Sequence, residues 1–232
     1  MSSKASDPSA WPIRRRSGRA EELFVTPEGP FERRVEVLEV DGPTVVLGSA
    51  QRLPLFDRDR ATKRGVELVV RRSGGSAVWL NPSDTLWVNV LIPAGDRLWI
   101  DDSTQSFFWL GDCWRAALIR AGIDSRDAVV HRAGLRKRRW SDVVCFAGLG
   151  PGEVVVDGRK VVGLSQRRTR DYALFQCAVL RRWDPAPLVS LLLPEVLAPD
   201  SEADVVADLA PLAGGVGDLD VLGPFLDELR AR

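Results

Sequence analysis

The sequence predicts a single mixed α+β domain, with a largely antiparallel or mixed sheet flanked by helices. Short apolar runs of strand length are separated by turn residues and interrupted by a few amphipathic stretches. The strict strand–helix alternation of a doubly wound parallel sheet is missing. The 232 residues are 45% hydrophobic and 28% charged, as in ordinary globular proteins, so we expect a full core that needs no disulfide or metal.

The composition excludes several classes of protein. Thirty-two basic and 32 acidic residues give no net charge, so nucleic acid is not an expected partner. No apolar run approaches the roughly 20 residues of a membrane span, and the N-terminus lacks an apolar signal core. Three cysteines and a single histidine, His131, argue against a disulfide framework, a multi-histidine metal site and a Ser-His-Asp triad. We therefore expect a cytoplasmic protein with no membrane contact and no resident metal.

The charge is unevenly distributed along the chain. Residues 184–232 hold ten acidic and two basic side chains, and we expect this acidic part to be helical. Two basic runs lie elsewhere, at 14–16 and 136–139. Each run is either solvated surface or a docking patch for an acidic partner. Residues 1–20 are polar, basic and aperiodic, which predicts a disordered leader before one domain over 21–232.

The elements of the first half follow from periodicity and turn residues. Strands are expected at 35–40 and 45–47, split by the turn 41–43, and at 67–71, 77–80 and 86–92. A short polar helix is expected at 56–64. The clearest helix covers 104–121, where apolar residues recur every three or four positions, Asp102 or Ser103 can cap the start, and Gly122 ends it.

The second half predicts a strand at 143–146, a loop at 147–152 and a hairpin. The hairpin strands are 153–156 and 159–166, joined by Asp157-Gly158, the turn chemistry of a type I′ loop. A strand follows at 173–180. Helices are expected near 185–192, 201–210 and 219–230, separated by proline and glycine.

Two segments of this pattern carry candidate chemistry. In residues 71–78, the bare backbone N–H groups around Gly74 and Gly75 could cradle a phosphate, carboxylate or thioester oxygen, with Arg71 supplying charge. The same Ser-Gly-Gly-Ser run is also an ordinary flexible turn. Cys145 ends an apolar strand next to a glycine-rich loop, a placement that suits either an activated thiolate or a buried structural thiol.

The third candidate is Lys160 in the hairpin. The two-residue turn predicts that Lys160 pairs with Val155 and shares the apolar face of Val162 and Leu164. A lysine there neutralises a ligand's negative charge, has a lowered pKa, or reaches solvent at the strand edge. We expect its truncation to cost little stability. Gly163 inside the strand suggests close approach of a ligand or a neighbouring backbone.

Together these segments resemble the lipoyl/biotinyl protein ligase superfamily, which includes lipoate-protein ligases and octanoyltransferases. The similarity covers roughly residues 40–195 in consistent order. It is carried by PTVVLGSAQ (43–51), RRSGGSAVWLNP (71–82), CFAGLGPGEVVVDGRKVVGLSQRR (145–168) and LFQCAVL (174–180). The Gly-Arg-Lys-x-x-Gly element is its most specific part, and Cys145 stands 15 residues before Lys160 as in the thiol-dependent octanoyltransferases.

The resemblance implies a class II aminoacyl-tRNA synthetase-like fold and a set of site residues. Cys145 and Lys160 would be catalytic; Arg71, Ser73, Gly74, Gly75, Ser76, Ala77, Val78, Gly163, Ser165 and Cys177 would bind substrate. The sequence departs from the family at Leu80-Asn81, where the family has His-Asp, and at Cys177, where it has histidine. A glycine-rich loop also replaces the Pro-Ser that follows Cys-Phe.

Three activities follow from this resemblance. In octanoyl transfer, needing no cofactor, Lys160 would stabilise a Cys145 thiolate that takes the acyl group from acyl carrier protein and passes it to a lipoyl-domain lysine. In lipoate ligation, needing ATP and Mg²⁺, Lys160 would contact an acyl adenylate made from lipoate or octanoate. A degenerate member would bind an acylated carrier without chemistry. The retained cysteine favours transfer.

Overall fold

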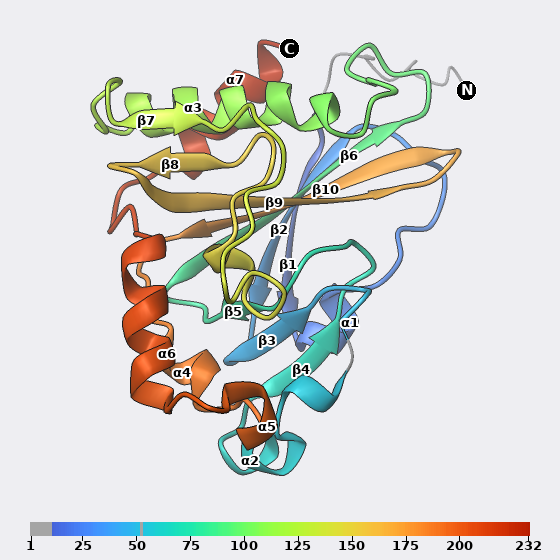
Figure 1. Ribbon diagram of the computed structural model, residues 1–232. Helices are drawn as coiled ribbons and strands as arrows, with labels where there is room; N and C mark the ends of the chain where they lie inside the picture. The colour runs from blue at the N-terminus through green and yellow to red at the C-terminus, as the bar shows by residue number, and fades with distance from the viewer. Residues whose placement is uncertain (1–10, 52) are drawn as a thin grey trace.

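Two sheets form the framework of the computed structural model, which describes residues 11–51 and 53–232 (Figure 1). The larger sheet has the strand order β1-β2-β6-β10-β9-β8-β7, and the smaller one the order β4-β3-β5. β1 and β2 run parallel, as do β3 and β4, and the other paired neighbours run antiparallel. The predicted mixed α+β class is confirmed.

The large sheet consists of β1 (Ile13–Gly18), β2 (Arg34–Val40), β6 (Thr85–Pro93), β7 (Ala128–Val130), β8 (Val154–Val156), β9 (Arg159–Arg168) and β10 (Tyr172–Leu180). The small sheet consists of β3 (Thr44–Leu47), β4 (Glu67–Val70) and β5 (Val78–Leu80). The helices are α1 (Ala20–Leu23), α2 (Arg58–Lys63), α3 (Phe108–Arg120), α4 (Ala186–Val189), α5 (Pro194–Leu197), α6 (Glu202–Leu209) and α7 (Leu222–Arg230). Short 3₁₀ turns lie at Leu53–Leu55, Gln105–Phe107, Cys145–Ala147 and Ala210–Leu212.

Helices α3 and α7 cover one face of the large sheet (Figure 1). Trp114 of α3 stacks on Phe225 of α7 with ring centroids 3.6 Å apart, and both side chains are fully buried. Each such buried aromatic removes a large apolar area from water and contributes about 1.5–3 kcal/mol. This packing confirms the helix expected over 104–121, whose first turn is 3₁₀ and whose end precedes Gly122.

The small sheet packs against the opposite face of the large sheet. Val46 and Val78 of the small sheet share a core with Trp87 and Ala178 of the large one. The C-terminal helices α4 and α6 cover the far side of the small sheet through a second core that includes Leu188 and Val205. The space between the two sheets, near the start of β9, is where the candidate site lies.

The N-terminal segment corrects a prediction. The disordered leader expected over residues 1–20 is wrong for 13–18, which form β1 in parallel with β2; its first ten residues lie outside the described residues. The three arginines of β1 are consecutive and have no apolar residue between them. An edge strand allows this, because its backbone pairs with one neighbour while its charged side chains stay in water. That 21–232 forms a single domain stays a prediction.

The strand expected over 143–146 is also wrong. One β-bridge joins Val144 to Ala77, and the chain then turns into the 3₁₀ turn of Cys145–Ala147. The Cys145 carbonyl, which could extend a ladder, instead accepts a hydrogen bond from the Lys160 ammonium at 2.9 Å. The helix near 185–192 is shorter than expected, and α5 was not predicted.

Candidate active site

A pocket of about 800 Å³ opens between the two sheets and brings together residues from four distant segments. Six of the predicted site residues line it: Gly74, Gly75, Ser76, Cys145, Lys160 and Ser165. Its volume falls within the ~300–1,000 Å³ range of small-molecule sites. Apolar side chains of Leu55, Phe107, Leu135 and Leu164 form much of its remaining wall.

Cys145 is one of the residues that line this pocket. Its N–H donates to the Ala77 carbonyl at 2.9 Å, which ties the nucleophile candidate to the start of the small sheet. The side chain is partly exposed, and Sγ lies 3.9 Å from Nζ of Lys160. The thiol and the ammonium are therefore within hydrogen-bonding reach of each other.

Lys160 is buried, with 3% of its side chain exposed. Its ammonium lies 2.7 Å from Oε2 of Glu153 and donates to the carbonyls of Cys145 at 2.9 Å and Gly148 at 3.2 Å. Burial alone would lower the pKa of Lys160, but the negative charges of Cys145 and Glu153 outweigh it, so the pKa is raised and the side chain is charged at neutral pH. The alternatives of a lysine with a lowered pKa and of a lysine reaching solvent at the strand edge are both wrong.

The hairpin confirms the predicted pairing of Lys160 but not the predicted face. Val155 pairs with Lys160 and Val154 with Val162, so Val161 is an extra residue, a β-bulge. The bulge turns Lys160 away from Val162 and onto the face of Gly163. A Cβ at Gly163 would lie 3.2 Å from the Phe146 ring and 3.4 Å from Cε of Lys160, so the glycine makes room for these side chains.

Glu153 is the site residue that the sequence analysis missed. Its carboxylate is buried, and besides Lys160 it accepts hydrogen bonds from the N–H groups of Gly150 at 2.6 Å and Leu164 at 3.1 Å. The signal in the sequence was weak. A carboxylate at the start of a hairpin strand is ordinarily solvated, and only the folded register places it over Lys160.

Arg71 has a different position from the one expected. Its guanidinium is buried and donates to the carbonyls of Val46, Gly74 and Ser76 and to Oγ of Ser73. Burial lowers the pKa of Arg71, although the charge of Cys145 opposes this. Arg71 therefore shapes the 73–76 loop from inside and does not present its charge to the pocket.

The loop over 73–76 leaves three backbone donors available. The N–H groups of Gly74, Gly75 and Ser76 donate to no group within residues 11–51 and 53–232. On the other side of the loop, a Cβ at Gly48 would lie 1.7 Å from the Gly75 carbonyl oxygen, so only glycine allows this contact. Free N–H groups in a preformed loop are suited to stabilising an oxyanion.

Besides Arg71 and Gly163, four predicted residues lie outside the pocket lining. Ser73 is buried and bonds Gln176 and Ser165, and Ala77 packs in the core beneath the small sheet. Cys177 points to the opposite face of β10, into the core under α3. Burial raises the pKa of Cys177 to about 12, which removes it from thiolate chemistry at neutral pH. Val78 lines only a small inner cavity with Arg71 and Gly163.

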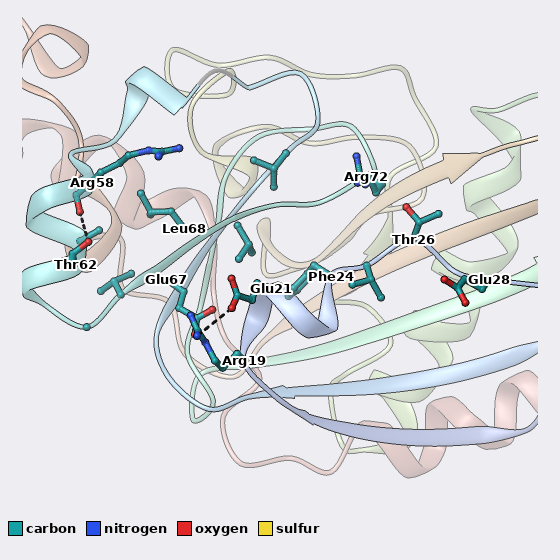
Figure 2. Close-up of a pocket in the computed structure, with 16 residues that line it drawn as sticks. Arg19, Glu21, Phe24, Thr26, Glu28, Arg58, Thr62, Glu67, Leu68 and Arg72 are labelled. Carbon is teal, nitrogen blue, oxygen red and sulfur yellow. Dashed lines mark hydrogen bonds and ion pairs between the residues drawn. The ribbon is translucent and has the colours of Figure 1, made fainter.

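A larger pocket, of about 900 Å³, runs along the outer edge of β4 between α1 and α2 (Figure 2). Its wall contains no cysteine and none of the predicted site residues. Arg19 there is paired with Glu67 at 3.3 Å and Glu21 at 3.2 Å. The larger volume therefore does not coincide with the predicted site residues, and Cys145 and Lys160 line the smaller pocket.

The electrostatics of the smaller pocket are balanced. Its two described cations are each ion-paired, Lys137 with Asp142 at 2.7 Å and Lys160 with Glu153 at 2.7 Å. The described lining therefore has no net charge, an environment that suits a neutral ligand better than a polyanion.

Within residues 11–51 and 53–232, no three or more His, Cys, Asp or Glu side chains are grouped so as to hold a metal ion. None of the described helices has the length and apolar character needed to cross a membrane.

Comparison with known proteins identifies relatives of this chain. The lipoyl protein ligase A/B catalytic domain matches residues 29–221. The octanoyltransferase LipM of Kyrpidia tusciae is 29% identical over 154 residues, which make up 66% of this chain and 56% of that protein. The matched region thus spans little more than half the length of this curated relative.

Solved structures share the fold at low sequence identity. Lipoate-protein ligase A bound with ATP is 17% identical with a TM-score of 0.66, covering 94% of this chain and 82% of that one. A bipartite lipoate protein ligase from Thermoplasma acidophilum is also 17% identical, with a TM-score of 0.65 and coverage of 94% and 81%. These likenesses establish the expected ligase-type scaffold.

Proposed function

The chain belongs to the lipoyl protein ligase A/B catalytic domain family, and from this membership we propose that it is an acyltransferase that moves an octanoyl or lipoyl group onto a lysine of a lipoyl carrier domain through Cys145. The observation that carries the proposal is the placement of the Cys145 thiol 3.9 Å from a buried, charged lysine in the lining of a partly apolar pocket. A nucleophile, a charge that favours its anion and a wall for an acyl chain thus occur together.

The first step transfers the acyl group to the enzyme. The Cys145 thiolate attacks the carbonyl carbon of an acyl thioester carried by acyl carrier protein, and a C–S bond forms. The carbonyl oxygen becomes an oxyanion, which the free N–H groups of Gly74, Gly75 and Ser76 would stabilise. The C–S bond to the carrier then breaks, and the carrier thiolate takes the proton that Cys145 gave up.

The second step transfers the acyl group to the acceptor. A neutral lysine amine of the lipoyl domain attacks the Cys145 thioester, and a C–N bond forms as the C–S bond breaks. The amine proton returns to the Cys145 sulfur, which restores the starting enzyme. The Lys160 ammonium favours Cys145 as a leaving thiolate in this step, so the same contact serves both halves of the reaction.

The ATP-dependent alternative has less support in this pocket. A triphosphate and its Mg²⁺ need net positive charge and carboxylate ligands, whereas the described cations here are already paired with Asp142 and Glu153. The residues present therefore do not fit ATP and Mg²⁺ well, and we derive no step through an acyl adenylate. A binding-only protein remains the third alternative.

Intact-mass measurements separate the three activities. Octanoyl-carrier protein should add one octanoyl mass to the wild type, removable by hydroxylamine, and none to Cys145→Ala. Cys113→Ala is the matched control, because Cys113 is buried in the core, and it should acylate normally. Modification of a lipoyl domain only with ATP plus lipoate would instead establish a ligase. No product in either mixture would leave a binding protein.

The partner surface follows from the basic run 136–139, which borders the pocket through Lys137. Lys137 and Arg139 are paired with acidic residues of this chain, whereas Arg136 and Arg138 are exposed and enter no ion pair with the described residues. We therefore expect the double variant Arg136→Glu/Arg138→Glu to raise the KM for the acidic carrier about tenfold at low salt, with kcat unchanged.

Steady-state kinetics at several salt concentrations test this expectation. Reversing the exposed pair Arg14 and Arg15, on the opposite edge of the large sheet, provides a control with the same change in net charge. Equal KM values for the two double variants would show that the run near the pocket is solvated surface only.

A further inference from the structure

The Glu153 side chain makes three interactions that join the glycine-rich loop to β9. Its Oε2 accepts from Gly150 in the glycine-rich loop and pairs with Lys160, and its Oε1 accepts from the backbone of Leu164 in β9. The carboxylate is almost completely buried. A buried charge with this many partners keeps a single position, because any rotation would break several hydrogen bonds at once.

The pairing with Glu153 changes what Lys160 can do for Cys145. An ammonium has three N–H donors. The structure directs them to one carboxylate and to the carbonyls of Cys145 and Gly148, while Sγ lies farther away at 3.9 Å. The carboxylate also offsets the positive charge that the sulfur experiences. Lys160 therefore lies next to the thiol, but its pairing with Glu153 weakens the electrostatic stabilisation that its ammonium can give to the sulfur.

We propose that Glu153 is a positioning residue that directs one Lys160 proton away from the Cys145 sulfur and offsets the charge of the lysine, so that the thiol of the free enzyme is less reactive than the lysine alone would make it. The inference rests on the proposed function only in taking Cys145 as the nucleophile. Without the carboxylate, the two carbonyls still hold the ammonium in place. Its third proton is then free to turn toward the sulfur.

The test is the rate at which iodoacetamide alkylates Cys145 at pH 7, followed by peptide mass spectrometry. Glu153→Gln should react faster than wild type by about threefold or more, because the Lys160 ammonium, still favoured in its charged form by the carbonyls of Cys145 and Gly148, is no longer offset by the carboxylate. Lys160→Met should react more slowly than wild type. The double variant Glu153→Gln/Lys160→Met should match Lys160→Met, because Glu153 acts through the lysine.

A matched control removes a buried, ion-paired carboxylate elsewhere. Asp96 pairs with Arg33 at 2.5 Å, both side chains 6% exposed, and lines neither pocket. Asp96→Asn should therefore lose stability without changing the Cys145 rate. If Glu153→Gln does not fold, Glu153→Asp keeps the charge but withdraws it from the lysine, and its rate should lie above that of wild type.

Two outcomes would overturn the inference. One is a folded Glu153 variant that reacts no faster than wild type. The other is an acceleration that persists without Lys160, which would show a structural loosening around the thiol. Alkylation needs no acyl donor, so an enzyme that obeys this pattern yet transfers no octanoyl group would refute the proposed function and leave the role of Glu153 intact.

Discussion

Replacing Lys160 with methionine should destabilise the fold by an amount that the structure specifies. The substitution leaves the Glu153 carboxylate buried without its cation, which typically costs 3–5 kcal/mol. The carboxylate keeps the N–H groups of Gly150 and Leu164, so we expect about 3 kcal/mol, the lower end of that range. The sequence predicts little loss on truncation from the premise that the lysine is partly exposed, and that premise is wrong, because the side chain is buried.

Urea unfolding followed by fluorescence of the eight tryptophans measures this loss. Because the pKa of Lys160 is raised in the folded protein, its contribution is fully present below the ordinary value of 10.5 and is lost only as pH rises through the folded value. The difference between variant and wild type should therefore be constant from neutral pH to about pH 10 and shrink above it.

Two further variants complete this experiment. Lys160→Met/Glu153→Gln removes both charges and should recover more than half of the lost free energy of unfolding. Lys137→Met breaks an exposed pair with Asp142 and should leave the unfolding curve unchanged. Unfolding of Lys160→Met at the urea concentration of wild type would contradict this cost of an unpaired buried carboxylate, and so would a double variant no more stable than the single one.

Two other predictions concern the remaining thiols and the glycine contact behind the loop. Burial raises the pKa of Cys113 to about 11 and that of Cys177 to about 12, so native protein at pH 9 should take one iodoacetamide adduct and protein in urea three. Above about pH 9 these two thiols ionise in the unfolded chain but stay protonated in the folded protein. Ionisation therefore favours the unfolded state, and the free energy of unfolding should fall as pH rises from about 9 toward 12. Gly48→Ala should slow acyl-enzyme formation about tenfold or more, because its Cβ would displace the Gly75 carbonyl; Gly42→Ala, with open space around it, should not.

Local sequence predicted the parts of the fold that depend on neighbouring residues. The spacing of apolar residues predicted the helix over 104–121, and Asp157-Gly158, both with positive φ, predicted the tight hairpin turn. The family motifs predicted that Cys145 and Lys160 would meet, and their atoms are 3.9 Å apart. These features depend on propensity, turn chemistry and a short loop, which a stretch of 20 residues contains in full.

Tertiary structure alone decided the features that depend on distant or irregular partners. The edge strand β1 exists because β2 offers it a backbone ladder, although its own sequence is a run of arginines. Arg71 turns inward because four hydrogen-bond acceptors surround its guanidinium there. Cys177 lies on the face of β10 that packs in the core under α3, opposite the face that is turned toward the 73–76 loop.

The β-bulge at Val161 shows, within one hairpin, that local sequence does not predict an irregularity of strand pairing. Strict alternation placed Lys160 on the apolar face, and a single extra residue moved it to the face of the pocket, where Glu153 neutralises it. The sequence by itself determined that a lysine would lie in this hairpin near a cysteine. Its burial, charge state and partner were decided by the fold, because a buried ion pair forms only where packing excludes water from both groups at once.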